Sequence, residues 1–332
     1  MAHCTLKDCP YDQDGRCVEN QLPNCPNLVP EKPVTKNQQE ETPSTPEPVK
    51  YEDLYAGTKL TADEATRMLQ SNRAQLVVLG GGVESGKTTL LARVFEMFQS
   101  GGVADLRFAS SNTLRDFDKL SWHATMECDG VSPDTEHTYR SENNRFLHLR
   151  IRVGDCSEPP TDLLIGDIPG EIFPEAIAEQ SVCRNLCALG AAHHLVLFLD
   201  GGVLSHTTDR HDHCGKVFDF VDQALQTGQI GRHTILHLVV SKSDLLPIET
   251  TSEVRKYVKG IEKAFHERFT TSVGSVRSWY LAARPDHPFD PTLEEIAKMF
   301  KEWMNPELPH TKVPTMEPER LTFQRDFCCF GL

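Results

Sequence analysis

Apolar residues recur along the chain in short runs that alternate with longer segments of helical periodicity. The runs are rich in Val, Ile and Leu, whereas the segments between them place apolar residues three or four positions apart. Strands separated by helices pair in parallel through right-handed crossovers, and helices then cover both faces of the sheet. The pattern therefore predicts a three-layer α/β fold with a mainly parallel central sheet. The expected strands are Gln75–Leu79, Phe146–Val153, Asp162–Ile165, Leu195–Leu199, Ile235–Val240 and Val276–Leu281, and the expected helices are Thr88–Gln99, Glu171–Leu189, Lys216–Gln226, Glu253–Phe269 and Thr292–Met304.

The N-terminal part of the chain lacks this pattern. Four cysteines crowd into its first 25 residues, and a stretch rich in Pro, Glu, Thr and Gln follows, which is typical of an extended, solvated linker. Beyond it, Thr61 and Glu64 have the spacing of a capping box and begin one more helix before the first core strand. We expect a Cys-rich module at 1–28, a Pro/Glu-rich linker at 29–52, one α/β domain at 53–308 and a C-terminal tail at 309–332.

Composition excludes several classes of protein. Hydrophobic residues make up 39% of the 332 positions and charged residues 25%, close to the averages for soluble globular proteins, and the formal net charge is −14. A nucleic-acid-binding surface needs clustered Lys and Arg, so we expect no DNA or RNA partner. Neither a basic N-terminus followed by an apolar run nor a stretch of 18 apolar residues is present, so we expect no membrane segment and a cytoplasmic protein.

The strongest motif lies directly after the first expected strand. Residues 81–88 (GGVESGKT) satisfy G-x-x-x-x-G-K-[ST] between an apolar strand and an apolar-periodic helix, a context that a chance glycine-rich turn lacks. In such a P-loop, backbone N–H groups face the phosphates and the helix N-terminus adds its positive dipole. We assign Lys87 to the β- and γ-phosphates and the Thr88 hydroxyl to Mg²⁺. The expected nucleotide contacts here are Gly81, Gly82, Val83, Glu84, Ser85, Gly86, Lys87, Thr88 and Thr89.

A D-x-x-G sequence at Asp167–Gly170 follows the third expected strand. An Asp at a strand tip beside the P-loop strand can hold Mg²⁺, usually through a water, and the Gly170 N–H can bond a γ-phosphate oxygen. Loss of that contact on hydrolysis would release the loop. The motif alone is weak, with a surface turn as the alternative, and its order and strand context favour the phosphate site.

A variant of N-K-x-D follows the strand Ile235–Val240. The Asp244 carboxylate can accept hydrogen bonds from N1–H and the 2-amino group of guanine, which adenine lacks, and the stem of Lys242 can pack along the base. Because Ser241 replaces the usual Asn, we expect the bonds with which that amide braces the loop to be weakened or lost.

In motif order the chain resembles the Ras-like GTPases, with GGVESGKT, DIPG and SKSD followed by Ala282 and Ala283 where that family has a loop beside the base. It resembles still more closely the bacterial double-GTPases of conflict and defence systems, over residues 70–305 and including a Cys-rich leader. The resemblance implies a P-loop GTPase domain that binds GTP or GDP with Mg²⁺ and acts beside a protein adaptor or effector.

The residues that would complete catalysis stay open. Glu171 stands where the Ras-like pattern has a water-orienting Gln, so it is either a catalytic group or a residue of the first helical turn that favours the helix dipole. Thr135 and Thr138 are candidates for the threonine that completes Mg²⁺ coordination, and Thr135 is preferred. Arg140 and Arg145 are candidates for a cation that stabilises the transition state, against the alternative of surface arginines. With Lys87 and Glu171, Arg140 makes up the expected catalytic set.

Two groups of Cys and His residues have the composition of metal sites. Cys4, Cys9, Cys17 and Cys25 suit a tetrahedral structural Zn²⁺, although the spacing lacks C-x₂-C pairs and reduced cysteines in a leader are the alternative. His206, His211, His213 and Cys214 fall in an expected polar loop, where solvated histidines are the rule.

Three functions fit the motifs. The favoured one is a switch that hydrolyses GTP slowly and presents different surfaces to a protein partner in its two nucleotide states. The others are an adaptor that binds nucleotide without turnover and an ATP-using P-loop protein.

Overall fold

The computed structural model describes residues 3–7, 9–18, 22–29, 57–71, 73–101, 105–125, 144–154, 159–249, 251–284 and 292–304. The chain divides into two compact units, Met1–Asp53 and Leu54–Leu332.

The N-terminal unit contains one small antiparallel strand pair and one helical turn. Strand β1 (His3–Cys4) pairs with β2 (Leu28–Val29), and helix α1 (Tyr11–Asp14) lies between them in the sequence. Cys4 and Cys25 are buried.

The C-terminal unit is built on a seven-stranded sheet with the order β4-β5-β6-β3-β7-β8-β9. Five neighbouring strands, from β6 to β9, run parallel, whereas β5 is antiparallel to β6 and β4 is antiparallel to β5. The fold is therefore the predicted α/β type with a mainly parallel sheet. The strands are β3 (Ala74–Gly80), β4 (Leu106–Ser110), β5 (Phe146–Val153), β6 (Thr161–Asp167), β7 (His194–Asp200), β8 (Ile235–Ser241) and β9 (Ser275–Tyr280).

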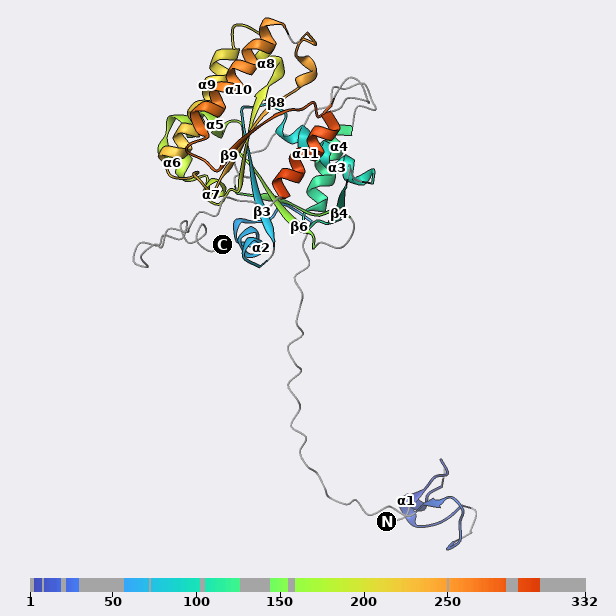
Figure 1. Ribbon diagram of the computed structural model, residues 1–332. Coiled ribbons are helices and arrows are strands. Elements are labelled where there is room, and N and C mark those ends of the chain that lie inside the picture. The colour runs from blue at the N-terminus through green and yellow to red at the C-terminus, as the bar shows by residue number, and fades with distance from the viewer. Residues whose placement is uncertain are drawn as a thin grey trace, which may run out of the picture. The chain divides into compact units, whose positions relative to one another are not determined.

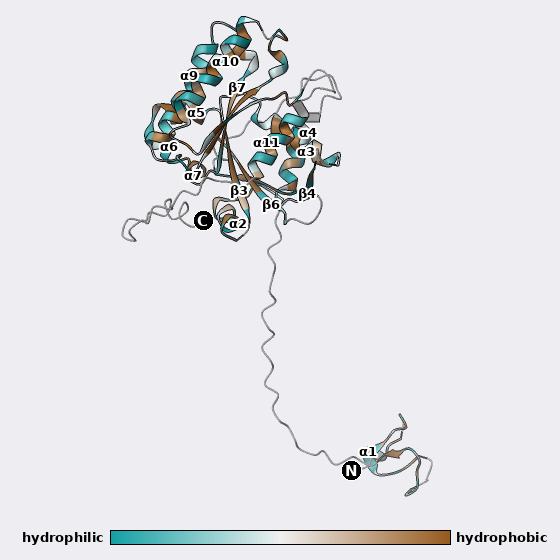
Figure 2. Cartoon of the chain, viewed as in Figure 1, coloured by the Kyte–Doolittle hydropathy of each residue, from teal (hydrophilic) through white to brown (hydrophobic). Residues whose placement is uncertain are grey.

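Helices cover both faces of this sheet, as Figure 1 shows for α3, α4 and α11 on one side and α5, α9 and α10 on the other. Every residue of β7 and β8 is buried, which explains their continuous apolar runs, and in Figure 2 the strands are mostly brown whereas the helices are mixed. The helices are α2 (Ala62–Ser71), α3 (Lys87–Gln99), α4 (Leu114–Thr125), α5 (Ile172–Ala178), α6 (Gln180–Arg184), α7 (Cys187–Gly190), α8 (Gly201–Ser205), α9 (Arg210–Gln226), α10 (Glu253–Phe269) and α11 (Thr292–Met304), with a 3₁₀ turn, η3 (Ser243–Leu245).

Local signals set several of these boundaries. The predicted capping box begins α2, since Glu64 accepts the Thr61 N–H at 2.7 Å and donates its own N–H to the Thr61 hydroxyl at 3.3 Å. The Thr61 N–H is the largest cause that holds the pKa of the Glu64 carboxyl below its usual range, and the Thr61 hydroxyl, which donates to the same carboxylate at 2.8 Å, lowers it further. Both α10 and α11 have the predicted bounds.

The prediction of one long helix over Glu171–Leu189 is wrong. The segment forms α5, α6 and α7, because Glu179 adopts an extended conformation (φ −124°, ψ 116°) and Leu186 leaves the helical region (φ −77°, ψ 74°). Helix α9 begins six residues before the predicted Lys216, with a polar first turn.

Two histidines sit among the buried residues of β7 and β8. The Trp279 indole donates its N–H to His237 Nδ1 at 2.9 Å, and His237 Nε2 lies 3.0 Å from His194 Nδ1. Since an indole can only donate, the neutral His237 carries its proton on Nε2 and donates it to His194. Burial lowers the pKa of His194 to about 3, lowers that of the neighbouring His193 to about 4, and holds that of His237 well below its usual value.

No helix among the described residues is long and apolar enough to cross a membrane.

Candidate nucleotide-binding site

Lys87 lies inside the loop that joins β3 to α3. Its side chain is buried, and its ammonium group donates to the carbonyl oxygens of Gly81 and Gly82 at 3.0 and 2.9 Å. The Ser85 hydroxyl lies 3.3 Å from the same nitrogen. Burial lowers the pKa of Lys87, and the negative charges of Asp167 and Glu171 oppose that shift. The loop from Gly81 to Gly86 thus folds around a cation.

The D-x-x-G segment packs directly on the tip of this loop. A Cβ atom added to Gly170 would lie 2.5 Å from the Val83 nitrogen and 2.7 Å from its Cα, so only glycine allows this backbone contact. The contact is positioned by parallel pairing of β3 with β6, in which Leu79 lies opposite Asp167 and its carbonyl oxygen accepts the Ile168 N–H at 2.9 Å.

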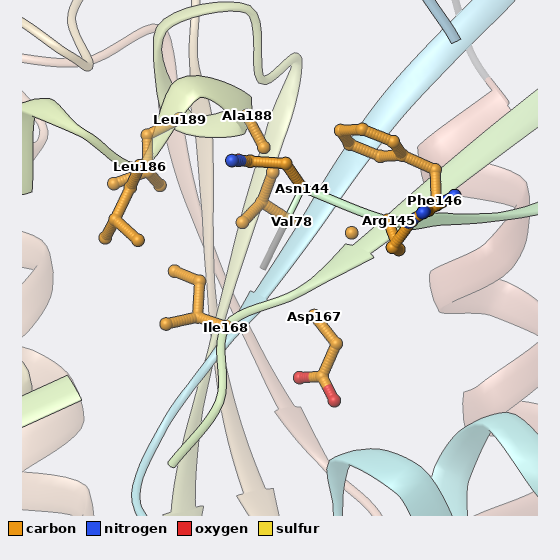
Figure 3. Close-up of a pocket in the computed structure, with 10 residues that line it drawn as sticks. Val78, Asn144, Arg145, Phe146, Asp167, Ile168, Leu186, Ala188 and Leu189 are labelled. Atoms are coloured by element: carbon orange, nitrogen blue, oxygen red, sulfur yellow. The ribbon is translucent and has the colours of Figure 1, made fainter. Parts of the chain in front are cut away.

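Asp167 and Thr88 line one small pocket, together with Lys59 and Arg145. Arg145 directly precedes β5, whose first residues lie beside the end of β6; Figure 3 shows Asp167 together with Arg145 and Phe146 around a neighbouring pocket. Lys59 reaches the site because Leu60 forms an antiparallel bridge with Phe146. Lys59 belongs to none of the motifs that the sequence contains.

The pocket offers a hydroxyl and a carboxylate oxygen, the donor types that Mg²⁺ prefers. The residues present therefore fit this ion. Thr135, Thr138 and Arg140 lie outside the described residues and stay predictions. Glu171 is exposed at the N-cap of α5, and its charge acts on Lys87.

A larger cavity of about 280 Å³ lies on the other side of α3. The cavity lies between the beginning of that helix, the loop after β8 and the segment after β9. The predicted residue Ala282 is buried and does not line this cavity. The lining residues are Gly86, Thr89, Leu90, Phe198, Ser241, Lys242, Asp244, Leu245, Leu281, Ala283 and Arg284.

Ser241, which stands where the N-K-x-D motif has Asn, itself braces this loop. Its hydroxyl lies 2.7 Å from the Ser85 carbonyl oxygen and 3.2 Å from that of Leu199. Because one hydroxyl has one proton, the shorter contact is the main hydrogen bond. Ser241 ties the loop after β8 to the P-loop through this bond.

Asp200 and Gly201, which the sequence analysis did not select, also contact this loop. The Asp200 carboxylate lies 2.7 Å from the Lys242 ammonium group. A Cβ on Gly201 would lie 2.5 Å from the Lys242 carbonyl oxygen and 2.6 Å from that of Ser241. An acidic residue at the carboxyl end of a buried parallel strand is the signal that could have identified Asp200.

The zinc prediction finds no support in the described residues. Cys4, Cys9, Cys17 and Cys25 form no disulfide among the described residues, and no three His, Cys, Asp or Glu side chains in the described ranges are grouped so that they could hold a metal ion. The predicted polar loop around His213 is instead the first turns of α9, where Cys214 is buried and His213 accepts the Asp200 N–H at 2.9 Å.

The sequence matches the Double-GTPase 2 family model over residues 75–304, which includes β3, the P-loop and all later described elements of the C-terminal unit. The chain belongs to the Double-GTPase 2 family. The family confirms the predicted resemblance and assigns this double-GTPase chain to the P-loop GTPases that bind guanine nucleotide.

No curated protein matches the sequence of this double-GTPase chain. Among solved structures, it is similar to translation elongation factor SelB from Methanococcus maripaludis at 10% identity and a TM-score of 0.36, covering 71% of this chain and 34% of SelB. It is similar to Sup35 complexed with GMPPNP at 17% identity and a TM-score of 0.29, covering 65% of this chain and 38% of Sup35. The double-GTPase chain thus spans well under half of either protein, and we infer no function from them.

Proposed function

We propose that this chain is a Mg²⁺-dependent GTP-binding switch that hydrolyses GTP slowly and acts with a protein partner. The observation that carries the proposal is that two pockets lie next to the beginning of α3. One contains Thr88 and Asp167 beside a buried lysine, and the other contains Asp244 and Lys242. A triphosphate bound along the P-loop would reach both.

The phosphate end has the charge that phosphoryl transfer needs. Lys87 would neutralise the β- and γ-phosphates, while Thr88 and Asp167 would hold Mg²⁺, which supplies further positive charge when bound. Arg145 and Lys59 line the same pocket and are placed to add charge near the γ-phosphate. Glu171 would orient water, and as an anion near the phosphate it favours slow turnover.

The base end has the polarity that guanine recognition needs. Asp244 is exposed within the cavity lining and would accept from N1–H and the 2-amino group, while Leu90, Phe198 and Leu281 provide apolar surface for the ring. Ala283 lies at the same cavity. These features support guanine over adenine.

The switch element would be the contact between Gly170 and Val83. Backbone atoms of the two segments are so close that a movement of the P-loop tip toward the D-x-x-G segment would displace that segment. A γ-phosphate that bonds the Gly170 N–H would fix this segment, and its loss would release it. The resemblance to defence-associated double-GTPases supports an adaptor or effector as the partner that reads the change.

Titration of the full chain with GTP, GDP and ATP in Mg²⁺, followed by single-turnover phosphate release, tests the proposal. We expect tighter binding of guanine nucleotides and slow phosphate release from GTP. Lys87→Ala should abolish both, while Lys263→Ala on the exposed face of α10 should leave both unchanged. Asp244→Asn should shift the preference from guanosine to xanthosine nucleotides.

Each alternative has its own outcome in the same measurements. GTP binding with no phosphate release, with or without a partner, would establish a nucleotide-binding adaptor. Tighter binding of ATP than of GTP would instead indicate an ATP-using protein and exclude the guanine assignment.

A further inference from the structure

Asp200 joins three elements at the end of β7. Its side chain is buried, with 9% of the surface exposed, and one carboxylate oxygen accepts the Gly202 N–H at 2.8 Å as the cap of α8. The other oxygen lies 2.7 Å from the ammonium group of Lys242. Its backbone N–H is donated to His213 Nε2 on α9. The position of the carboxylate is therefore set by its strand and by α8, independently of the contact with Lys242.

Lys242 needs such an anchor because its backbone is strained. It adopts a left-handed conformation (φ 47°, ψ 42°), which is costly for a residue that carries a Cβ atom. The backbone of Gly201 lies directly against the Lys242 and Ser241 carbonyl oxygens. The Ser205 hydroxyl donates to the Gly201 carbonyl oxygen of its own helix at 2.9 Å and lies 3.2 Å from the Leu245 carbonyl oxygen. The loop that carries Asp244 thus rests on α8.

The ion pair determines where the lysine stem lies. The ammonium group is held by Asp200 while the backbone stays in the loop after β8, so the four-carbon stem spans part of the cavity wall. Ser241 has a different task, since its hydroxyl bonds the P-loop carbonyl of Ser85. The loop is consequently held at two points by two different side chains.

We propose that Asp200 is a positioning residue for base recognition, which fixes the Lys242 ammonium group so that its stem packs on the purine and Asp244 faces the guanine edge. This inference rests on the proposed guanine-nucleotide function. Asp200 touches no nucleotide atom and acts through Lys242.

The test compares dissociation constants for GTP and ATP in wild type, Asp200→Asn, Lys242→Met and the double variant of the full chain. Asn keeps the size and an acceptor for the Gly202 N–H but removes the charge that holds the lysine. We expect Asp200→Asn to weaken GTP binding roughly tenfold and to leave ATP binding, which depends on the P-loop, almost unchanged. In the double variant the two effects should not add.

Asp212→Asn is the matched control, because it removes the same charge from an exposed ion pair with Lys216 on α9. It should leave both dissociation constants unchanged. Unchanged GTP binding in Asp200→Asn would show that Asp200 is only a helix cap, since Asn keeps that role, and would overturn the inference. Equal losses for GTP and ATP, or losses that add to those of Lys242→Met, would show that Asp200 does not act on the base through Lys242 and would overturn it as well. Wild type without any preference for GTP would instead reject the guanine assignment itself.

Discussion

The Ser241 hydroxyl donates to the Ser85 carbonyl oxygen across 2.7 Å, and this single bond connects the loop after β8 with the P-loop. The two residues are 156 positions apart in the sequence. Both are buried, so the bond is shielded from water. The proposed phosphate-binding loop and the proposed base-binding loop are therefore connected through this side chain.

Ser241→Ala should weaken this connection. The Ser85 carbonyl oxygen would lose its side-chain donor in a buried site, which costs about 1–3 kcal/mol. We expect a lower urea midpoint and weaker binding of both GTP and ATP, since the bond supports the P-loop itself. Ser278→Ala, which removes a half-buried hydroxyl 2.9 Å from His266, is the control and should leave nucleotide affinity unchanged. Wild-type affinity in Ser241→Ala would contradict the connection.

Gly170→Ala should impair the response to the γ-phosphate. The added Cβ would meet Val83 backbone atoms at 2.5 and 2.7 Å, so the D-x-x-G segment must move away from the P-loop tip. We expect single-turnover GTP hydrolysis to fall at least tenfold and the affinity ratio of GTP to GDP to fall with it, because the displaced N–H is a γ-phosphate contact. Gly215→Ala provides the comparison, since a Cβ there meets nothing within 4 Å. Unaltered hydrolysis by Gly170→Ala would exclude the proposed switch contact.

Arg145→Ala should slow GTP hydrolysis with little effect on GTP affinity. The side chain lines the pocket of Thr88 and Asp167, and a cation near the transferred phosphoryl group stabilises the transition state more than the ground state. We expect a decrease of roughly a hundredfold in the single-turnover rate. Arg152→Ala, at the opposite end of β5, should retain the wild-type rate. Equal rates in the two variants would exclude Arg145 as the cation that stabilises the transition state.

Stability should fall as the pH is lowered below about 6.5. His193 and His194 have folded pKa values of about 4 and 3, below the unfolded value of 6.5, because burial disfavours their charged forms. The unfolded chain therefore binds more protons in this window, and stability is present above pH 6.5 and lost as the pH falls toward 4. Each histidine contributes up to about 1.4 kcal/mol per pH unit.

Urea unfolding at pH 7 and pH 5 measures that loss. Exposed histidines and carboxylates contribute little to the change in unfolding free energy between these pH values. Because His194→Gln removes one of the buried histidines, it should reduce that change. An unfolding free energy that is the same at pH 7 and pH 5 would show that these histidines are accessible to protons in the folded state.

The sequence predicts most of the fold because the information is local. Strands buried on both faces appear as continuous apolar runs, and α10 and α11 have clear periodicity, so their bounds agree with the structure. Strand β4 was missed because only one of its five residues is buried, which leaves no alternation to detect. The breaks at Glu179 and Leu186 have no strong Gly or Pro signal.

The residues of the candidate site also differ in whether local sequence can identify them. Lys87, Asp167 and Asp244 belong to motifs with fixed spacing, which local sequence can identify. Asp200 and Lys59 approach the site only through the strand order, by way of the β7–β8 pairing and the Leu60–Phe146 bridge. No spacing rule identifies a contact that depends on how strands are ordered.

The backbone of Gly201 touches two carbonyl oxygens of the neighbouring loop, which leaves room there for nothing larger than a hydrogen atom. Substitution of Gly201 is consequently excluded, whereas Gly215 can be substituted because a Cβ atom there would meet nothing within 4 Å. Among relatives that keep Lys242 and Asp244, position 201 should remain glycine, whereas position 215 in α9 should vary. The restriction at position 201 would therefore come from contact between backbone atoms, which a motif of side chains does not show.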